Sequence, residues 1–177
     1  MDRHSANVSE YTRTICVSMG LDEQLSRDIT RAAALHDIGK VYVPERILTK
    51  KAALTDDEYR EVKKHVSHGY RLLYRDDDPF FKMAALVALE HHERMDGSGY
   101  MGLEADEISF PARIVAVADV FDALVTERSY KDSWGFEKAF DYICLHKRDL
   151  FDCDVVTAFA AAQNKIYRQY LKNSEIC

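Results

Sequence analysis

The sequence predicts an all-α protein built as a single domain of six to eight helices. Glycine and proline are few, at seven and three of 177 residues, which suits long helices better than a loop-rich β-sandwich. Apolar residues recur at helical spacing in most segments, and no segment shows a convincing strand pattern or an internal repeat. A chain of this length is one domain's worth, which we expect to span residues 1–171 with a frayed tail at 172–177.

The first two helices are marked by apolar spacing and by caps. Apolar residues follow a helical period over residues 5–19, and Gly20 is suited to the C-cap that ends this helix. Asp22 can cap a second helix. We expect this second helix to run close to Gly39, with its apolar residues on one face.

The next two helices are an amphipathic one and a buried one. Thr55 and Glu58 have the separation of a capping box, so a third helix is expected to begin there and continue to Leu73. Residues 80–92 are apolar nearly all round, and the fourth helix is therefore expected to be central.

The C-terminal half is expected to contain a loop and then three helices. Residues 94–110 contain three glycines and are typical of a loop. A helix over 111–126 follows, with proline at its first position. Two more are expected over 136–147 and 154–171, and Asp152 is the expected cap of the last one.

Composition and charge exclude several classes of protein. The 24 Lys and Arg against 30 Asp and Glu give a net charge of −6, which argues against binding a nucleic-acid polymer or an anionic membrane surface. No apolar run approaches a membrane span, and no signal peptide is evident, so a cytoplasmic location without membrane insertion is expected. The four cysteines form no Cys-x-x-Cys pair, which leaves zinc fingers and thioredoxin-like chemistry unsupported.

Histidine and aspartate carry the chemical information. His36 and Asp37 alone would be read as a satisfied core histidine beside a cap. Asp119 differs, because it lies in an otherwise apolar helix, where a carboxylate is costly unless it is paired or binds metal. Arg113 could provide such a pair, which leaves both explanations open.

Five histidines and two aspartates are expected to face inward from four or five helices: His4, His36, Asp37, His65, His91, His92 and Asp119. Helical domains build metal sites from side chains on facing helices in this way. The set offers nitrogen and oxygen without sulfur and suffices for two ions, with Fe, Mn, Ni and Zn all compatible. Glu93, directly after the histidine pair, is expected to orient a ligand rather than to be one.

The Gly-x-Gly-x-x-Gly pattern of residues 97–102 is not read as a dinucleotide fingerprint. That motif requires a strand before it and a helix after it, and here it follows a helix. We therefore expect a tight loop.

Several spaced motifs together resemble the HD-GYP group of HD-domain phosphohydrolases, over residues 4 to about 160. The matching stretches are HDIGK at 36–40, LT at 54–55, His65 with Gly69, HHERMDGSGY at 91–100, ARI at 112–114, ADVFDAL at 118–124 and RSYK at 128–131. This group is all-helical. The resemblance implies a bacterial signalling phosphodiesterase that hydrolyses cyclic di-GMP to linear pGpG and/or GMP by a metal-bridged hydroxide.

The resemblance also implies roles for individual residues. The seven residues named above become ligands of two divalent ions, with Fe or Mn favoured over Ni or Zn, and Asp37 bridges the ions. Lys40 contacts the substrate phosphate and, with Asp37, forms the catalytic pair. Substrate-facing positions are assigned to Lys40, Tyr100, Asp122, Arg128 and Lys131. An upstream receiver or sensor domain and a homodimer are further expectations.

The chain departs from the group's pattern at two places. The group takes its name from a Gly-Tyr-Pro motif, and this chain has Met101 in place of the proline. Methionine does not fix φ as proline does, so the loop around Tyr100 is expected to be looser. Some members of the group hold a third ion with a glutamate one helical turn before the first histidine ligand. In this chain that position would fall ahead of Met1, so two ions are expected rather than three. Two alternatives therefore stay open: a phosphohydrolase of another cyclic dinucleotide such as cyclic GMP-AMP, and a slow, metal-bound sensor or partner-binding domain.

Overall fold

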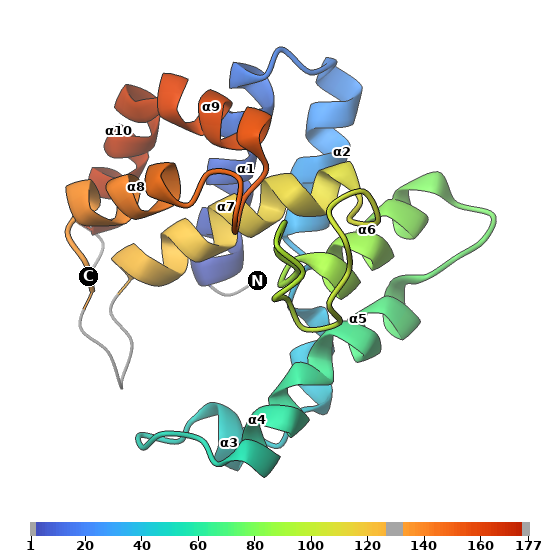
Figure 1. Ribbon diagram of the computed structural model, residues 1–177. Coiled ribbons are helices and arrows are strands. Elements are labelled where there is room, and N and C mark those ends of the chain that lie inside the picture. The colour runs from blue at the N-terminus through green and yellow to red at the C-terminus, as the bar shows by residue number, and fades with distance from the viewer. Residues whose placement is uncertain (1–2, 127–132, 175–177) are drawn as a thin grey trace.

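The computed structural model describes residues 3–126 and 133–174, and within these ranges the protein is helical without strands (Figure 1). The α-helices of this part are α1 (Arg3–Ser18), α2 (Glu23–Ala33), α3 (Glu45–Leu48), α4 (Asp56–Lys63), α5 (His65–Leu73), α6 (Pro79–Glu90), α7 (Phe110–Val125), α8 (Phe136–Leu145), α9 (Cys153–Ala161) and α10 (Gln163–Ser174). A 3-10 helix, η1 (Ile38–Tyr42), follows α2. The all-α prediction is confirmed. No helix in the described ranges has the length and apolarity needed to cross a bilayer.

The predicted helix caps are present. The Asp22 carboxylate accepts hydrogen bonds from the first turn of α2, and Asp152 does the same for α9. Thr55 and Glu58 form both halves of the capping box that begins α4. These side chains satisfy backbone N–H groups that a helix start leaves without partners, which explains why each helix begins where it does.

The α-helices of the described residues outnumber the six to eight expected because two predicted helices are each divided and the short α3 was not predicted. The segment 56–73 is interrupted at Lys64, which separates α4, with no buried residue, from α5, with four. The segment 153–174 is likewise divided at Ala162. Helix α10 continues to Ser174, so residues 172–174 are helical where a frayed tail was expected.

The second helix ends earlier than predicted, at Ala33, and the chain turns into η1 before Gly39. Gly39 lies directly against the backbone of α5: a Cβ added there would be 1.9 Å from the carbonyl oxygen of His65. The prediction that α2 runs close to Gly39 is therefore wrong. The close contact with α5 requires the chain to leave the α2 axis.

Helix α7 lies at the centre of the molecule, in contact with α1, α6, α8 and α9 (Figure 1). Ten of its sixteen residues are buried, including Asp119 and Asp122. Two buried carboxylates in an apolar helix are tolerated only with close partners. Those partners come from α1 and the ends of α2 and α6.

Candidate metal centre

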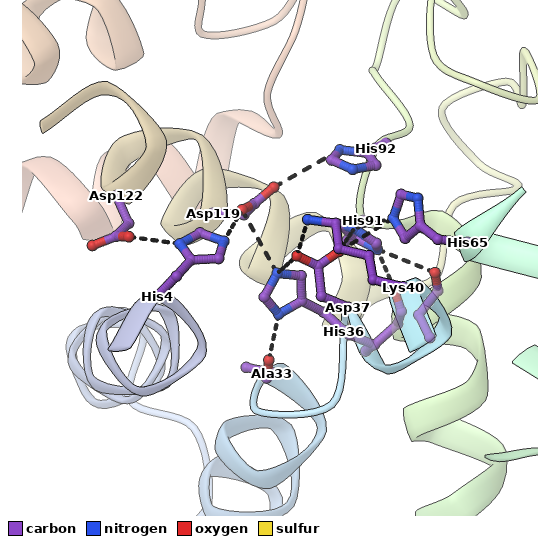
Figure 2. A network of polar contacts seen from close by, with 12 residues as sticks. His4, Ala33, His36, Asp37, Lys40, His65, His91, His92, Asp119 and Asp122 are labelled. Atoms are coloured by element: carbon purple, nitrogen blue, oxygen red, sulfur yellow. Dashed lines mark hydrogen bonds and ion pairs between the residues drawn. The ribbon is translucent and has the colours of Figure 1, made fainter. Parts of the chain in front are cut away.

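The seven histidines and aspartates that the sequence selected lie together on facing elements (Figure 2). Their imidazole and carboxylate atoms fall into two clusters, in each of which the candidate ligand atoms are all within 4.8 Å of one another. The first cluster contains Asp37, His65, His91 and His92, and the second contains His4, His36 and Asp119.

The first cluster forms where η1, α5 and the end of α6 meet. Asp37 Oδ1 lies 3.3 Å from His65 Nε2 and 3.8 Å from His91 Nε2. The two imidazole nitrogens are 3.4 Å from each other. His65 and His91 are fully buried, so their nitrogens face the cluster rather than solvent.

The second cluster joins the N-terminal turn of α1 to α7. Asp119 Oδ1 lies 3.1 Å from His4 Nε2 and 3.7 Å from His36 Nε2. The predicted alternative partner of Asp119 is elsewhere: Arg113 donates to the Ile108 carbonyl and to Asp152. Asp119 is therefore surrounded by imidazoles instead of a guanidinium.

Each aspartate reaches both clusters with different oxygens. Asp37 turns Oδ1 to the first cluster and Oδ2 to His36 of the second, at 3.4 Å from Nε2. Asp119 turns Oδ1 to the second cluster and Oδ2 to His92 of the first, at 3.8 Å from Nδ1. The two clusters thus form one centre with two carboxylate bridges (Figure 2).

The backbone fixes the orientation of three imidazoles. Nδ1 donates to the Ala33 carbonyl in His36 and to the Val62 carbonyl in His65, and the His91 ring is bonded in the same way within α6. A histidine that donates through Nδ1 presents a lone pair on Nε2, which is how metal-binding histidines are commonly oriented.

The donor atoms fit divalent cations. His36 Nε2 and Asp37 Oδ1 are buried and have no hydrogen-bond partner, although buried polar atoms nearly always have one. Burial lowers the pKa of His91 well below its ordinary value and that of His92 to about 4, so these imidazoles are neutral near pH 7. Burial raises the pKa of Asp119, but hydrogen bonding to His4 and the nearby imidazoles outweigh it, and the carboxylate stays ionised. Neutral imidazoles and carboxylates are ligands for such metals.

Comparison with known proteins agrees with this geometry. The family model described as "HD domain" matches residues 1–155. The chain belongs to the HD-domain family. A Thermotoga maritima protein named "Cyclic di-GMP phosphodiesterase" is 41% identical over 174 residues, which are 98% of this chain and 47% of that protein. The chain thus spans about half of that relative, and its resemblance to the HD-GYP group is confirmed.

Two solved structures are similar to this HD domain. The Bdellovibrio bacteriovorus HDG"Y"P protein Bd1817 superposes with a TM-score of 0.71 at 19% identity, covering 93% of this chain and 51% of that one, which supports the fold. A V. cholerae cyclic GMP-AMP specific phosphodiesterase, V-cGAP3, has a TM-score of 0.54 at 32% identity, covering 92% and 36%. HD domains bind divalent metals, and the two clusters are where this HD domain offers the ligands.

Asp122, which was predicted to face the substrate, is placed by the structure against α1. Its side chain is fully buried, with Oδ2 at 2.6 Å from His4 Nδ1 and Oδ1 accepting from Asn7 at 2.9 Å. The Asp122 carboxylate thus orients the His4 imidazole. Burial lowers the pKa of His4, but its hydrogen bonds and charge attraction to Asp119 and Asp122 outweigh burial and raise the pKa to about 9. The sequence signal for this role was the three-residue spacing of the two aspartates on α7.

Lys40 and Tyr100 border the first cluster of the HD domain. The Lys40 ammonium pairs with Asp37 and is partly exposed. The Tyr100 ring centroid is 4.5 Å from that of His92, and the Lys63 ammonium lies 4.6 Å from the Tyr100 centroid. Sequence reasoning missed Lys63, which lies near the end of α4. The predicted Arg128 and Lys131 lie outside the described residues.

A cavity of about 740 Å³ opens beside the first cluster. Its wall includes Lys40, His65, His92 and Tyr100, and continues to Lys50 and Lys51 of the α3–α4 connection. No aspartate or glutamate is among the described residues that line it, in a chain whose net charge is −6. Its size is that of a small-molecule site, and its three lysines can attract an anionic ligand, although Lys40 also pairs with Asp37 and Lys50 with Glu58.

Proposed function

We propose that this HD domain is a metal-dependent phosphodiesterase that hydrolyses cyclic di-GMP to linear pGpG and/or GMP. The observation that carries the proposal is the pair of ligand clusters bridged by Asp37 and Asp119, with an anion-compatible cavity beside them. The name of the Thermotoga maritima relative supports the same activity.

The proposed ligands are the seven residues of the two clusters. Their number and their division into two groups favour two ions. We propose Fe or Mn, as the motif resemblance implies, and the nitrogen and oxygen donors are also compatible with Ni or Zn. When bound, such a pair supplies Lewis-acid stabilisation of phosphoryl oxygens and an activated water. Asp37 would serve both ions, because its two oxygens face different clusters, as those of Asp119 also do.

The other residues bind and orient the substrate. Lys40 can turn from Asp37 to a non-bridging phosphate oxygen, to which it brings a positive charge. Tyr100 offers an aromatic face for a base next to His92. Arg128 and Lys131 are proposed to contact the second phosphate or a guanine, as the motif resemblance implies.

A second candidate is the hydrolysis of cyclic GMP-AMP. It is favoured by the similarity to V-cGAP3, which is 32% identical and is titled a cyclic GMP-AMP specific phosphodiesterase. Both substrates present the same phosphodiester to the metal centre. The choice between them therefore depends on contacts to the bases.

Product analysis with both dinucleotides in parallel, together with elemental analysis of the same sample, tests the proposal. We expect two metal equivalents and faster conversion of cyclic di-GMP, with pGpG or GMP as product. Faster conversion of cyclic GMP-AMP would establish the second candidate. A metal-loaded protein that converts neither would refute both and support a sensor or partner-binding domain.

A cytoplasmic location, an upstream receiver or sensor domain and a homodimer stay predictions from the sequence.

A further inference from the structure

Glu93 occupies an unusual position between the metal centre and the loop that carries Tyr100. It follows His92 directly, and its side chain is buried, with 4% of the residue exposed. Both carboxylate oxygens accept backbone hydrogen bonds from the loop: Oε1 from Met101 N at 2.8 Å, and Oε2 from Leu103 N at 3.0 Å. Both oxygens thus face the loop, and Glu93 belongs to neither ligand cluster.

The loop is closely packed around this carboxylate. A Cβ added at Gly99 would lie 2.6 Å from both the Cα and the Oε2 of Glu93, so the backbone passes directly over the side chain. Tyr100 stands between Gly99 and Met101, the two points of contact. The Glu93 carboxylate therefore fixes the backbone on both sides of Tyr100.

The hydrogen bond from Met101 is chemically informative, because proline has no N–H to donate. Proline at 101 would restrict φ but would leave Glu93 Oε1 buried without this partner. An unpaired buried acceptor on a charged group is costly. The expectation that methionine makes the loop looser therefore has to be weighed against two hydrogen bonds to the Glu93 carboxylate, one of which proline could not donate.

We propose that Glu93 is a positioning residue: its carboxylate holds the backbone N–H groups of Met101 and Leu103 by hydrogen bonds and thereby places Tyr100 beside His92. These hydrogen bonds replace the backbone rigidity that a proline at 101 would give. This inference rests on the proposed function, in which Tyr100 contacts a base. Charge-assisted hydrogen bonds to backbone N–H groups are among the stronger ones, so two of them can order a short loop before substrate arrives. Ordering the loop in advance lowers the cost of binding.

The test compares Glu93→Gln with Glu104→Gln, a matched change at an exposed residue of the same loop. Glutamine keeps the shape of the side chain but offers one acceptor where two N–H groups need one each. We expect Glu93→Gln to raise KM for cyclic di-GMP about three- to tenfold, with kcat and metal content kept, because only the ordering of the loop is lost. Glu104→Gln should match the unaltered protein.

Two further variants separate positioning from general damage. Glu93→Gln and Tyr100→Ala combined should raise KM no more than Tyr100→Ala alone, because one acts through the other. Met101→Pro should raise KM, because proline removes the N–H that donates to Glu93. If backbone rigidity alone ordered the loop, proline would lower KM instead. An unchanged KM in Glu93→Gln, additive effects in the double variant, or loss of metal in proportion to loss of activity would overturn the proposal.

Amide hydrogen exchange at Leu103 provides a readout that does not depend on activity. In the unaltered protein this amide should exchange slowly, and Glu93→Gln should accelerate its exchange while leaving the core of α7 protected. If the unaltered protein does not hydrolyse cyclic di-GMP but the Leu103 amide behaves as expected, the proposed function is refuted and the positioning role of Glu93 is supported. Equal exchange of this amide in both proteins would refute the positioning role of Glu93.

Discussion

The two ligand clusters differ in what holds them. In the first, the fully buried His65 and His91 are each fixed by a backbone carbonyl three residues earlier, that of Val62 in α4 for His65 and that of Ala88 in α6 for His91. In the second, the Ala33 carbonyl holds His36 in the same way, but His4 lies on the first turn of α1, is partly exposed, and is oriented by the side chain of Asp122. A ligand fixed by the backbone moves only when its helix moves. One fixed by a single carboxylate can be released by one substitution, so we expect the second cluster to bind its ion more weakly.

The largest effect is expected from Asp37→Ala, which removes the carboxylate shared by both clusters. Turnover should be abolished and metal content should fall in both clusters, because the ligands that remain are imidazoles with one bridging carboxylate. Circular dichroism should show a folded protein. Full activity in a folded, metal-analysed variant would contradict the assignment of Asp37.

Lys40→Ala should have the next largest effect, and it should leave both clusters loaded. We expect kcat/KM to fall about 10- to 1,000-fold, the scale of one lost charge-stabilising contact. Steady-state kinetics and elemental analysis on the same preparation make the measurement. If the kinetics stay unchanged, the Lys40 ammonium only neutralises Asp37.

Asp122→Asn addresses the difference between the clusters directly. The amide keeps the volume but loses the charge-assisted bond to His4, so affinity for the second ion should fall about 10- to 100-fold while the first ion stays bound. Titration with a chelator, followed by elemental analysis, should reveal a one-ion form. Equal loss of both ions would show that the clusters are not independently held.

Tyr100→Ala is expected to have the smallest effect, on the substrate side of the first cluster. KM should rise about tenfold, using ~1–3 kcal/mol for one base–aromatic stack, with metal content unchanged. If neither KM nor kcat moves, the loop is outside the substrate site, and the specificity for cyclic di-GMP loses its support.

The sequence was sufficient for the all-α class, for the position of most helices and for bringing the seven candidate ligands to one place. Their types, their position on inward faces and the motif resemblance all pointed the same way. The sequence was insufficient where contacts between distant segments determine the role of a side chain. Asp122 was assigned to the substrate because nothing local shows that His4 lies against it, 118 residues away. The role of Glu93 depends on where the loop backbone passes, which spacing along the chain does not reveal.

The contact between Gly39 and the His65 carbonyl has a consequence for how this domain tolerates mutation. The distance between Asp37 and His65 depends on how closely η1 approaches α5, and at Gly39 even a methyl group has no room. Gly39 contributes no atom to the clusters, yet a saturation library should be as depleted there as at the histidines. Sequence variation at such a position would report the spacing of the two backbones, and a search for active-site residues by their chemical groups would overlook it.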